Sequence, residues 1–461
     1  MWKRVIFTIF VIAALVVSTT PAAAGSPKTM IGINVVLKSN ITDAILADLG
    51  THGNVRDVVY EIKAVTMQAR AGELAVIQAL PYVAAANPDA ERDAAPVDVV
   101  SATDFTNGWN TWDLDAINVT DLQPGPDRVV TYDGTGVYVA VLDTGLVDVW
   151  RAYFPQERIA EEFATSFSGG GAMGAGEVAN QPNKWEHDQN SHGTHVTSTI
   201  LGFQRTATVK FNGVAPMATV IPVKVLNQNG SGWSSVIARG IVYVTDLKLS
   251  GALGTNPVVI NMSLGGTVLD AMEKAAIDYA VANDVIIVAS AGNRGTRGMG
   301  YPGAYAPVIS VAASGWTGEW VGDGSWWYAS NVADPTNPAD YYITDFSGRQ
   351  LAGQDLDVAA PGSWIVGPYK INSGMSLSYY YLGGTSMASP HVAGIVALMA
   401  QKDPNLTAAD AEDYLEAGAI YLAPGCRTVT DITGLSVEYC WGADATGSGL
   451  ITADAALAAT P

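Results

Sequence analysis

The stretch Val137-Tyr138-Val139-Ala140-Val141-Leu142-Asp143-Thr144-Gly145 is a short apolar run that ends in a carboxylate and a glycine. Continuous apolar runs are typical of strands buried on both faces of a sheet. Further runs follow, separated by segments with helical periodicity. The runs are Val220–Leu226, Val258–Met262, Val285–Ala289 and Val308–Ala312, and the helical segments are Ser235–Leu247 and Val268–Ala282. This alternation predicts an α/β fold in which helices flank a central, mostly parallel sheet.

Two stretches interrupt this pattern. Ser168–Asn190 is rich in Gly, and Gly315–Asp345 is rich in Trp, Tyr and Asn. Because neither has the periodicity of a helix or a strand, we expect both to be surface loops.

The amino terminus has the features of a secretory signal peptide. Lys3 and Arg4 precede a thirteen-residue apolar run, Val5–Val17, and small residues follow as far as Ala24. Such a run is too short to span a bilayer comfortably. We therefore expect a signal peptide over residues 1–24, secretion of the chain and no stable membrane span. An uncleaved anchor helix is the alternative.

Residues 25–108 differ from the α/β pattern that follows them. Between Thr29 and Asp93 the periodicity gives the order strand, helix, strand, strand, helix, strand. This order matches a small α+β, ferredoxin-like unit. Asp89–Gly108 is polar, contains Pro96 and lacks periodicity, so we expect a linker there. Residues 109–461 then form one large domain.

The charge argues against nucleic acid as a partner, and the cysteine content excludes a thiolate metal cluster. The 461 residues include 24 Lys and Arg against 44 Asp and Glu, which gives a net charge of −20. Such a surface repels phosphate backbones and argues against nucleic acid. The two cysteines, Cys426 and Cys440, are too few for a thiolate metal cluster. In an exported chain a disulfide between them is permitted, whereas two reduced thiols are the alternative if the chain is not exported.

Asp143 stands at the end of a predicted strand, where the catalytic groups of open α/β sheets collect. An Asp that only initiates a turn is the simple alternative. Asp-Thr-Gly also occurs in aspartic proteases, but their chemistry needs two carboxylates that share a proton. The chain has no second Asp-Thr-Gly or Asp-Ser-Gly, which excludes that class.

The segment Asn190-Ser191-His192-Gly193-Thr194-His195-Val196 places two histidines three residues apart, with His187 close by. A zinc site is one alternative, but the sequence has no His-Glu-x-x-His pairing. A catalytic base at His192 beside a core-packed His195 explains the pair better.

The segment Gly383-Gly384-Thr385-Ser386-Met387-Ala388-Ser389-Pro390-His391 joins a glycine turn to a predicted helix start, where Pro is tolerated. A serine at such a turn presents its Oγ to a cleft and its N–H to a developing oxyanion. The alternative is a serine that only caps the helix. Asp143, His192 and Ser386 together supply a carboxylate, a base and a nucleophile.

The blocks around His192 and Ser386, in the chain order Asp, His, Ser, resemble the signature blocks of the subtilisin-like serine proteases. The resemblance implies a subtilisin-like three-layer fold with residues 109–461 as the catalytic domain. It also implies a secreted endopeptidase that works through an acyl-enzyme, with Asn293 and the Ser386 N–H as the oxyanion hole. The residues that it implies for substrate binding are Ser231, Gly232, Ser263, Leu264, Gly265, Gly292 and Gly300.

The same resemblance assigns residues 25–108 to an inhibitory propeptide and linker, whereas a permanent amino-terminal domain is the alternative. The proenzyme would remove this segment itself, at a bond between about Ala94 and Trp112. Gly300 at the base of the primary pocket implies a preference for large apolar side chains, and Arg294 at its rim implies poor cleavage after Lys or Arg. The expected partners are protein or peptide substrates and the propeptide, and we expect a monomer.

Two other functions compete with this interpretation. The first is a catalytically inactive, subtilase-like binding protein. An esterase on an α/β-hydrolase fold would need a Gly-x-Ser-x-Gly elbow, which is absent at Ser386.

No cofactor is expected for catalysis. Many relatives carry a calcium loop after the His block, but Leu201–Asn212 has no carboxylate and contains two positive charges. Calcium prefers carboxylate and carbonyl oxygens, so we expect this site to be lost. Structural calcium elsewhere in the chain remains an alternative for which no ligands are assigned.

Overall fold

The computed structural model describes residues 27–102, 110–121, 127–171, 178–206, 208–322, 324–334, 336–370 and 378–461. The predicted signal peptide lies outside these ranges. Within them, no helix combines the length and the apolar character needed to cross a membrane.

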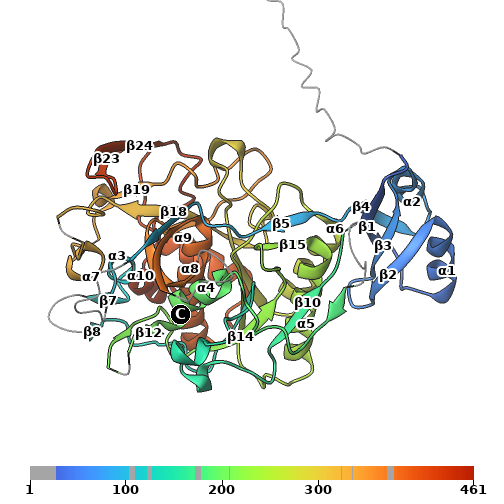
Figure 1. Cartoon of the computed structure of the whole chain (residues 1–461), viewed down its shortest axis with the longest axis horizontal. Coiled ribbons are helices and arrows are strands. Elements are labelled where there is room, and N and C mark those ends of the chain that lie inside the picture. The colour runs from blue at the N-terminus through green and yellow to red at the C-terminus, as the bar shows by residue number, and fades with distance from the viewer. Residues whose placement is uncertain are drawn as a thin grey trace, which may run out of the picture.

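The centre of the molecule is a nine-stranded sheet in the order β11-β10-β14-β9-β16-β17-β18-β19, with β20 paired to β18 (Figure 1). The pairs from β10 to β18 and the β18–β20 pair are parallel, whereas β11 and β19 run antiparallel to their neighbours. In sequence order the strands are β9 (Tyr138–Asp143), β10 (Thr165–Ser168), β11 (Ala179–Asn180), β14 (Thr219–Lys224), β16 (Val258–Met262), β17 (Val285–Ser290), β18 (Ile309–Trp316), β19 (Tyr341–Ile343) and β20 (Val358–Pro361). The predicted α/β class with a mostly parallel sheet is confirmed.

Helices cover both faces of this sheet and explain why its central strands are mostly apolar. Val139 and Val141 of β9 share a buried cluster with helices α4 (His192–Leu201) and α8 (Thr385–Lys402). The residues between and after them, Ala140 and Leu142, share another cluster with α5 (Ser234–Leu249) and α6 (Ala271–Val281). Alternate side chains of one strand therefore enter two different cores.

A smaller unit stands at one end of the molecule, coloured blue in Figure 1. Its four-stranded antiparallel sheet has the order β2-β3-β1-β4 and a buried cluster of its own. The elements are β1 (Met30–Leu37), α1 (Asp43–His52), β2 (Gly53–Val59), β3 (Ala64–Arg70), α2 (Leu74–Gln78) and β4 (Val83–Pro88). This is the predicted order of strands and helices.

The segment that follows the small unit differs from the prediction. Asp89–Gly108 was expected to be a linker without regular structure, but it contains β5 (Glu91–Asp93) and β6 (Asp98–Ser101). β5 pairs with β15 (Ser231–Trp233) and β6 pairs with β22 (Ser378–Gly383), which pairs in turn with β21 (Ile365–Tyr369). The prediction of an irregular linker is therefore wrong over these strands, because each depends on a partner far along the chain.

The prediction of surface loops was wrong for Gly315–Asp345. Trp326, Trp327, Tyr341 and Tyr342 are buried, and the rings of Trp326, Trp327 and Tyr342 pack against other aromatic side chains. Large aromatic side chains contribute much apolar area, which favours their burial even where the backbone is irregular. The Ser168–Asn190 stretch is mostly irregular in its described residues, as expected, although Trp185 and Asp188 are buried.

The other α-helices and strands of the described residues are short or lie near the carboxyl terminus. They are α3 (Trp112–Ala116), β7 (Thr120–Asp121), β8 (Asp127–Arg128), β12 (Phe203–Gln204), β13 (Lys210–Phe211), α7 (Trp326–Ala329), α9 (Ala408–Gly418), β23 (Gly425–Thr430), β24 (Ser436–Trp441) and α10 (Ala453–Ala459). A disulfide joins Cys426 of β23 to Cys440 of β24, which are directly paired residues of one hairpin.

Candidate active site

Asp143 and His192 lie together where β9 ends and α4 begins. Both side chains are fully buried, and His192 Nδ1 lies 2.9 Å from each carboxylate oxygen of Asp143. An N–H on Nδ1 donates to the carboxylate and leaves a lone pair on Nε2. Nε2 is buried and has no hydrogen-bond partner. The imidazole is therefore held in the tautomer that can accept a proton at Nε2.

Ser386 lies in the first turn of α8, and its side chain is almost fully buried. Its hydroxyl donates to the carbonyl oxygen of Ser263 at 3.2 Å. The Ser263 hydroxyl donates to the carbonyl oxygen of Ser386 at 2.8 Å. This reciprocal pair fixes the start of α8 against the end of β16.

Asn293 follows β17, and its side-chain amide is oriented by Thr385. The Thr385 N–H and hydroxyl donate to Asn293 Oδ1 at 2.9 and 2.8 Å. With Oδ1 engaged, the Nδ2 group is directed at the segment after β5 and lies 3.5 Å from the carbonyl oxygen of Ala95. Thr385 was not predicted as a residue that orients the amide, although it directly precedes Ser386 in the sequence.

The segment after the small unit runs through the site as an extended strand. The N–H of Asp93 donates to Gly265 O at 3.0 Å, and the N–H of Gly265 donates back to Asp93 O at 2.9 Å. The N–H of Ala94 donates to Gly230 O at 3.0 Å. Past the site, the N–H of Val97 donates to Gly383 O at 2.7 Å. The backbone is therefore held on both sides of the Ala95–Pro96 bond.

A cavity of about 330 Å³ opens beside this bond. Its walls include Gly265, Gly292, Asn293, Gly300 and Ser386, together with Arg294, and Asp93 and Ala95 of the segment that occupies the site. Gly292 has a positive φ of 90°, and a Cβ there would meet the Gly300 backbone at 2.9 Å. The predicted glycines thus line one cavity with the predicted oxyanion residues.

The other predicted substrate-binding residues lie on the two segments that flank the occupying segment, which are β15 and the residues that follow β16. Ser231 and Gly232 belong to β15, whose partners in β5 are Asp93 and Arg92. Ser263 contacts the start of α8 as described, and Leu264 is buried next to it.

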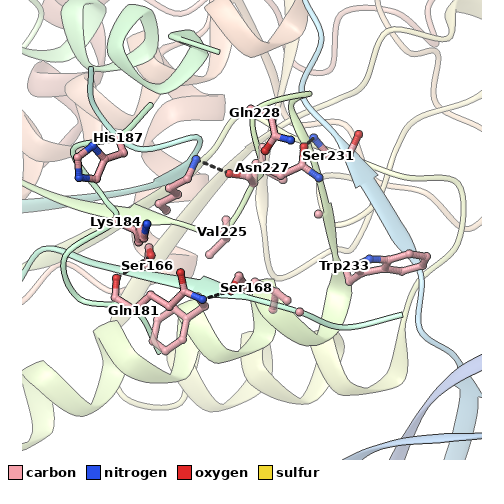
Figure 2. Close-up of a pocket in the computed structure, with 16 residues that line it drawn as sticks. Ser166, Ser168, Gln181, Lys184, His187, Val225, Asn227, Gln228, Ser231 and Trp233 are labelled. Carbon is pink, nitrogen blue, oxygen red and sulfur yellow. Dashed lines mark hydrogen bonds between the residues drawn. The ribbon is translucent and has the colours of Figure 1, made fainter. Parts of the chain in front are cut away.

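A second pocket, of about 300 Å³, lies on the other side of β15 (Figure 2). Ser166, Ser168 and Gln181 lie at one side of it and Asn227, Gln228 and Ser231 at another, with Gln181 donating to the Ser168 hydroxyl. It shares Ser231 and Gly232 with the edge of the first site. Its lining contains none of Asp143, His192, Asn293 and Ser386.

The histidine cluster does not form a metal site in the described part of the chain. His195 is buried and its Nε2 lies 3.2 Å from Ile365 O. Burial lowers the pKa of His195 to about 3, so this side chain is neutral. His187 is exposed. The expectation of a core-packed His195 is confirmed, and the groups of possible metal ligands among the described residues include no histidine.

The loop before His192 is organised by Asp188, which is buried. Its Oδ1 accepts from the N–H groups of Asn190 and Ser191, and its Oδ2 accepts from the Thr144 hydroxyl. Burial raises the pKa of Asp188 to about 6, although nearby Lys224 opposes this shift. Asp188 therefore connects the end of β9 to the start of α4.

Two groups of carboxylates bring oxygens within 4.8 Å of one another: Asp115, Asp121 and Asp334, and Asp355, Asp357 and Glu412. Burial is the main factor that raises the pKa values of Asp115 and Asp357 to about 7. The Leu201–Asn212 segment, expected to have lost a calcium loop, contains the β12–β13 hairpin. Subtilases need no cofactor for catalysis, and structural calcium stays a prediction without assigned ligands.

The chain resembles known proteins in sequence. Residues 134–442 match the model of the subtilase family. Subtilisin DY of Bacillus licheniformis is 34% identical over 295 residues, which span 63% of this chain and 86% of that protein. The thermostable alkaline protease of Halalkalibacterium halodurans is 33% identical over 63% of each chain.

A solved structure shows the same fold. Fervidolysin from Fervidobacterium pennivorans, a keratinolytic enzyme related to subtilisin, is matched with a TM-score of 0.65 at 23% identity, over 94% of this chain and 61% of that chain. The family match covers more than half of the sequence. The chain therefore belongs to the subtilase family, whose members are serine endopeptidases.

Proposed function

We propose that the chain is a secreted serine endopeptidase, made as a self-processing proenzyme, that uses Asp143, His192 and Ser386. The observation that carries this proposal is the Asn293 amide, which faces the Ala95 carbonyl oxygen in the cavity that Ser386 also lines. A peptide carbonyl that faces a proposed oxyanion donor, in a cavity shared with the proposed nucleophile, supports this assignment.

In the proposed mechanism the Ser386 hydroxyl turns from Ser263 O toward His192 Nε2, which takes its proton as Oγ attacks the carbonyl carbon. Asp143 keeps the imidazole in its tautomer and stabilises the imidazolium. The Asn293 amide and the Ser386 N–H stabilise the oxyanion. His192 then protonates the leaving amine, and water hydrolyses the acyl-enzyme by the same steps.

The proposal assigns residues 25–108 to the inhibitory propeptide and linker. Its support is the path of this segment, which runs from the small unit into the site and pairs with β15 and β22. The hydrogen bonds on both sides favour Ala95–Pro96 as the first bond cut, within the predicted window from Ala94 to Trp112. Residues 103–109 of that window lie outside the described residues. Amino-terminal sequencing of the secreted protein tests this assignment.

The primary pocket is proposed to take a large apolar side chain. Its volume of about 330 Å³ and its glycine walls support this, and Arg294 supports poor cleavage after Lys or Arg. A peptide library that showed a preference for basic residues at this position would contradict the assignment.

The decisive experiment compares the wild-type chain with Ser386→Ala by mass spectrometry of the secreted protein. Wild type should lose residues up to the maturation site, whereas Ser386→Ala should keep them when no other protease is present. A serine-directed phosphonate should label wild type at Ser386. Processing of Ser386→Ala at the wild-type site would overturn the role of Ser386 as the nucleophile, whereas a wild-type protein that resists the label would support the alternative of a binding protein.

A further inference from the structure

A buried ion pair joins the occupying segment to the large domain. The side chains of Arg92 and Glu273 are both fully buried. Arg92 Nε lies 3.2 Å from each carboxylate oxygen of Glu273, and Nη2 donates to Glu273 Oε2 as well. The same Nη2 donates to Val268 O at 3.0 Å. The large domain therefore receives this guanidinium with a carboxylate and a carbonyl oxygen.

The position of Arg92 along the segment is set by the backbone register. Arg92 pairs with Gly232 of β15, and the next residues follow the hydrogen bonds described above to Ala95. Counting back from Ala95, whose carbonyl faces Asn293, Arg92 is the fourth residue on the acyl side. A substrate that takes the same extended path would place its own fourth residue at Glu273.

The pocket is built by the large domain and would remain after the propeptide leaves. Glu273 lies in the first turn of α6, where the helix dipole favours a negative charge, and its N–H donates to the capping residue Asp270. The backbone of Gly266 also leaves room for the arginine, since a Cβ there would lie 2.6 Å from Arg92 Nη1.

The chemistry of this pocket favours an arginine side chain. Burial raises the pKa of Glu273, and the charge of Arg92 opposes that shift, so the carboxylate is best stabilised as an anion when a cation is present. An apolar side chain would leave the carboxylate and Val268 O without partners in a desolvated site. Arginine supplies a planar set of donors to both acceptors, whereas the compact ammonium of lysine has fewer.

We propose that Glu273 makes the fourth acyl-side subsite selective for arginine, so that the enzyme favours peptides with Arg three residues before the attacked carbonyl residue. This inference rests on the proposed peptidase function. It gives the enzyme a second selective subsite in addition to the primary pocket. Arg92 is then the chain's own ligand for that subsite.

The test uses enzyme matured from the full chain, with active sites counted by phosphonate titration. The substrates are acetyl-tetrapeptide p-nitroanilides that share the sequence of residues 93–95 and carry Arg, Lys, Leu or Glu at the fourth position. Wild type should cleave the Arg peptide with a kcat/KM roughly 30-fold or more above that of the Leu peptide. The reason is that removing one partner of a buried charge pair weakens binding by at least a comparable factor. The Lys peptide should fall between the Arg and Leu peptides.

Glu273→Leu should give the Leu peptide a higher kcat/KM than the Arg peptide. Glu273→Gln should reduce the ratio of kcat/KM for the Arg peptide to that for the Leu peptide. Because Glu273→Leu leaves Arg92 buried without its partner in the proenzyme, the double variant Arg92→Leu/Glu273→Leu provides the same pocket with a matching segment. Asp278→Asn removes a carboxylate from the exposed side of the same helix and should leave the selectivity unchanged.

Each outcome separates the two proposals. Equal cleavage of the Arg and Leu peptides by wild type, or an Arg preference that survives Glu273→Leu in the double variant, would overturn the subsite while leaving the peptidase intact. A wild-type protein that cleaves neither these peptides nor denatured casein, and that the phosphonate does not label, would overturn the proposed function and the subsite with it.

Discussion

Glu319 is a buried acid whose ionisation should make the stability of the protein depend on pH. Its side chain is 1% exposed. Oε1 accepts from the Trp316 N–H at 2.9 Å, and Oε2 accepts from the Tyr342 and Ser363 hydroxyls at 2.7 and 3.0 Å. Among the described residues it forms no salt bridge. Burial raises its pKa to about 8, although these hydrogen bonds oppose the shift.

The direction of the effect follows from proton binding. The reference pKa is 4.5, so between about pH 4.5 and 8 folded Glu319 holds a proton that the unfolded chain releases. The free energy of unfolding must then fall as the pH rises through this window. One pKa unit corresponds to about 1.4 kcal/mol, so the Glu319 contribution should fall by roughly 3–4 kcal/mol between pH 5 and 8.

Glu319→Gln isolates this contribution. The amide has nearly the same shape, cannot ionise, and can donate to the two hydroxyls, which also accept hydrogen bonds. Urea unfolding should be followed by tryptophan fluorescence from pH 5 to 8, in a Ser386→Ala background that prevents self-digestion. Subtracting the two curves cancels the contributions of other acids with raised pKa values, such as buried Asp115 and half-buried Glu412, that titrate in both proteins.

The variant should gain stability over the reference protein as the pH rises, by roughly 3–4 kcal/mol across the range. Glu157→Gln replaces an exposed glutamate by the same chemistry and controls for the general loss of one carboxylate. Parallel curves for Glu319→Gln and the reference protein would refute the reasoning, because they would mean that folded and unfolded Glu319 bind protons alike.

Three further predictions concern catalysis and packing. Asn293→Ala should lower kcat about 10²–10³-fold with little change in KM, as steady-state kinetics on peptides would measure; an unchanged kcat would remove Asn293 from the oxyanion hole. Replacing Cys426 and Cys440 by Ser should lower the free energy of unfolding by about 3 kcal/mol, by the chain-entropy model, and should lower the Tm. Activity should remain intact, because neither cysteine lines the active-site cavity. Gly394→Ala should destabilise by roughly 1–3 kcal/mol, because a Cβ at this position would lie 2.6 Å from Val214 Cβ; thermal unfolding of the variant with an unchanged Tm would contradict this.

The sequence predicted the central sheet well because its signal is local. The apolar run Val137–Leu142, which makes up most of β9, supplies side chains to two cores, and such a run is visible in a few residues. β5 gave no such signal, because its stability comes from β15, which lies about 140 residues later in the chain. The aromatic stretch Gly315–Asp345 was misassigned because burial of Trp and Tyr needs no regular backbone.

The candidate site likewise contains residues that local sequence predicts and one that it does not. Asp143, His192 and Ser386 were predicted because their chemistry requires particular residue types within short, recognisable blocks. Glu273 was not, because a charged residue within a predicted helix is usually on a solvated face. Only the position of Arg92, brought beside it by strand pairing, gives that carboxylate a role.

The order of the elements along the chain has a consequence for when the site first exists. The small sheet and its two helices are complete by Pro88, and the segment that enters the site follows immediately. Asp143, His192 and Ser386 are spread over more than half of the remaining chain, and α8 ends only at Lys402. Because a chain is synthesised from its amino terminus, the segment that occupies the site is made before the residues that form the site. At no stage of synthesis does a finished site precede the strand that covers it.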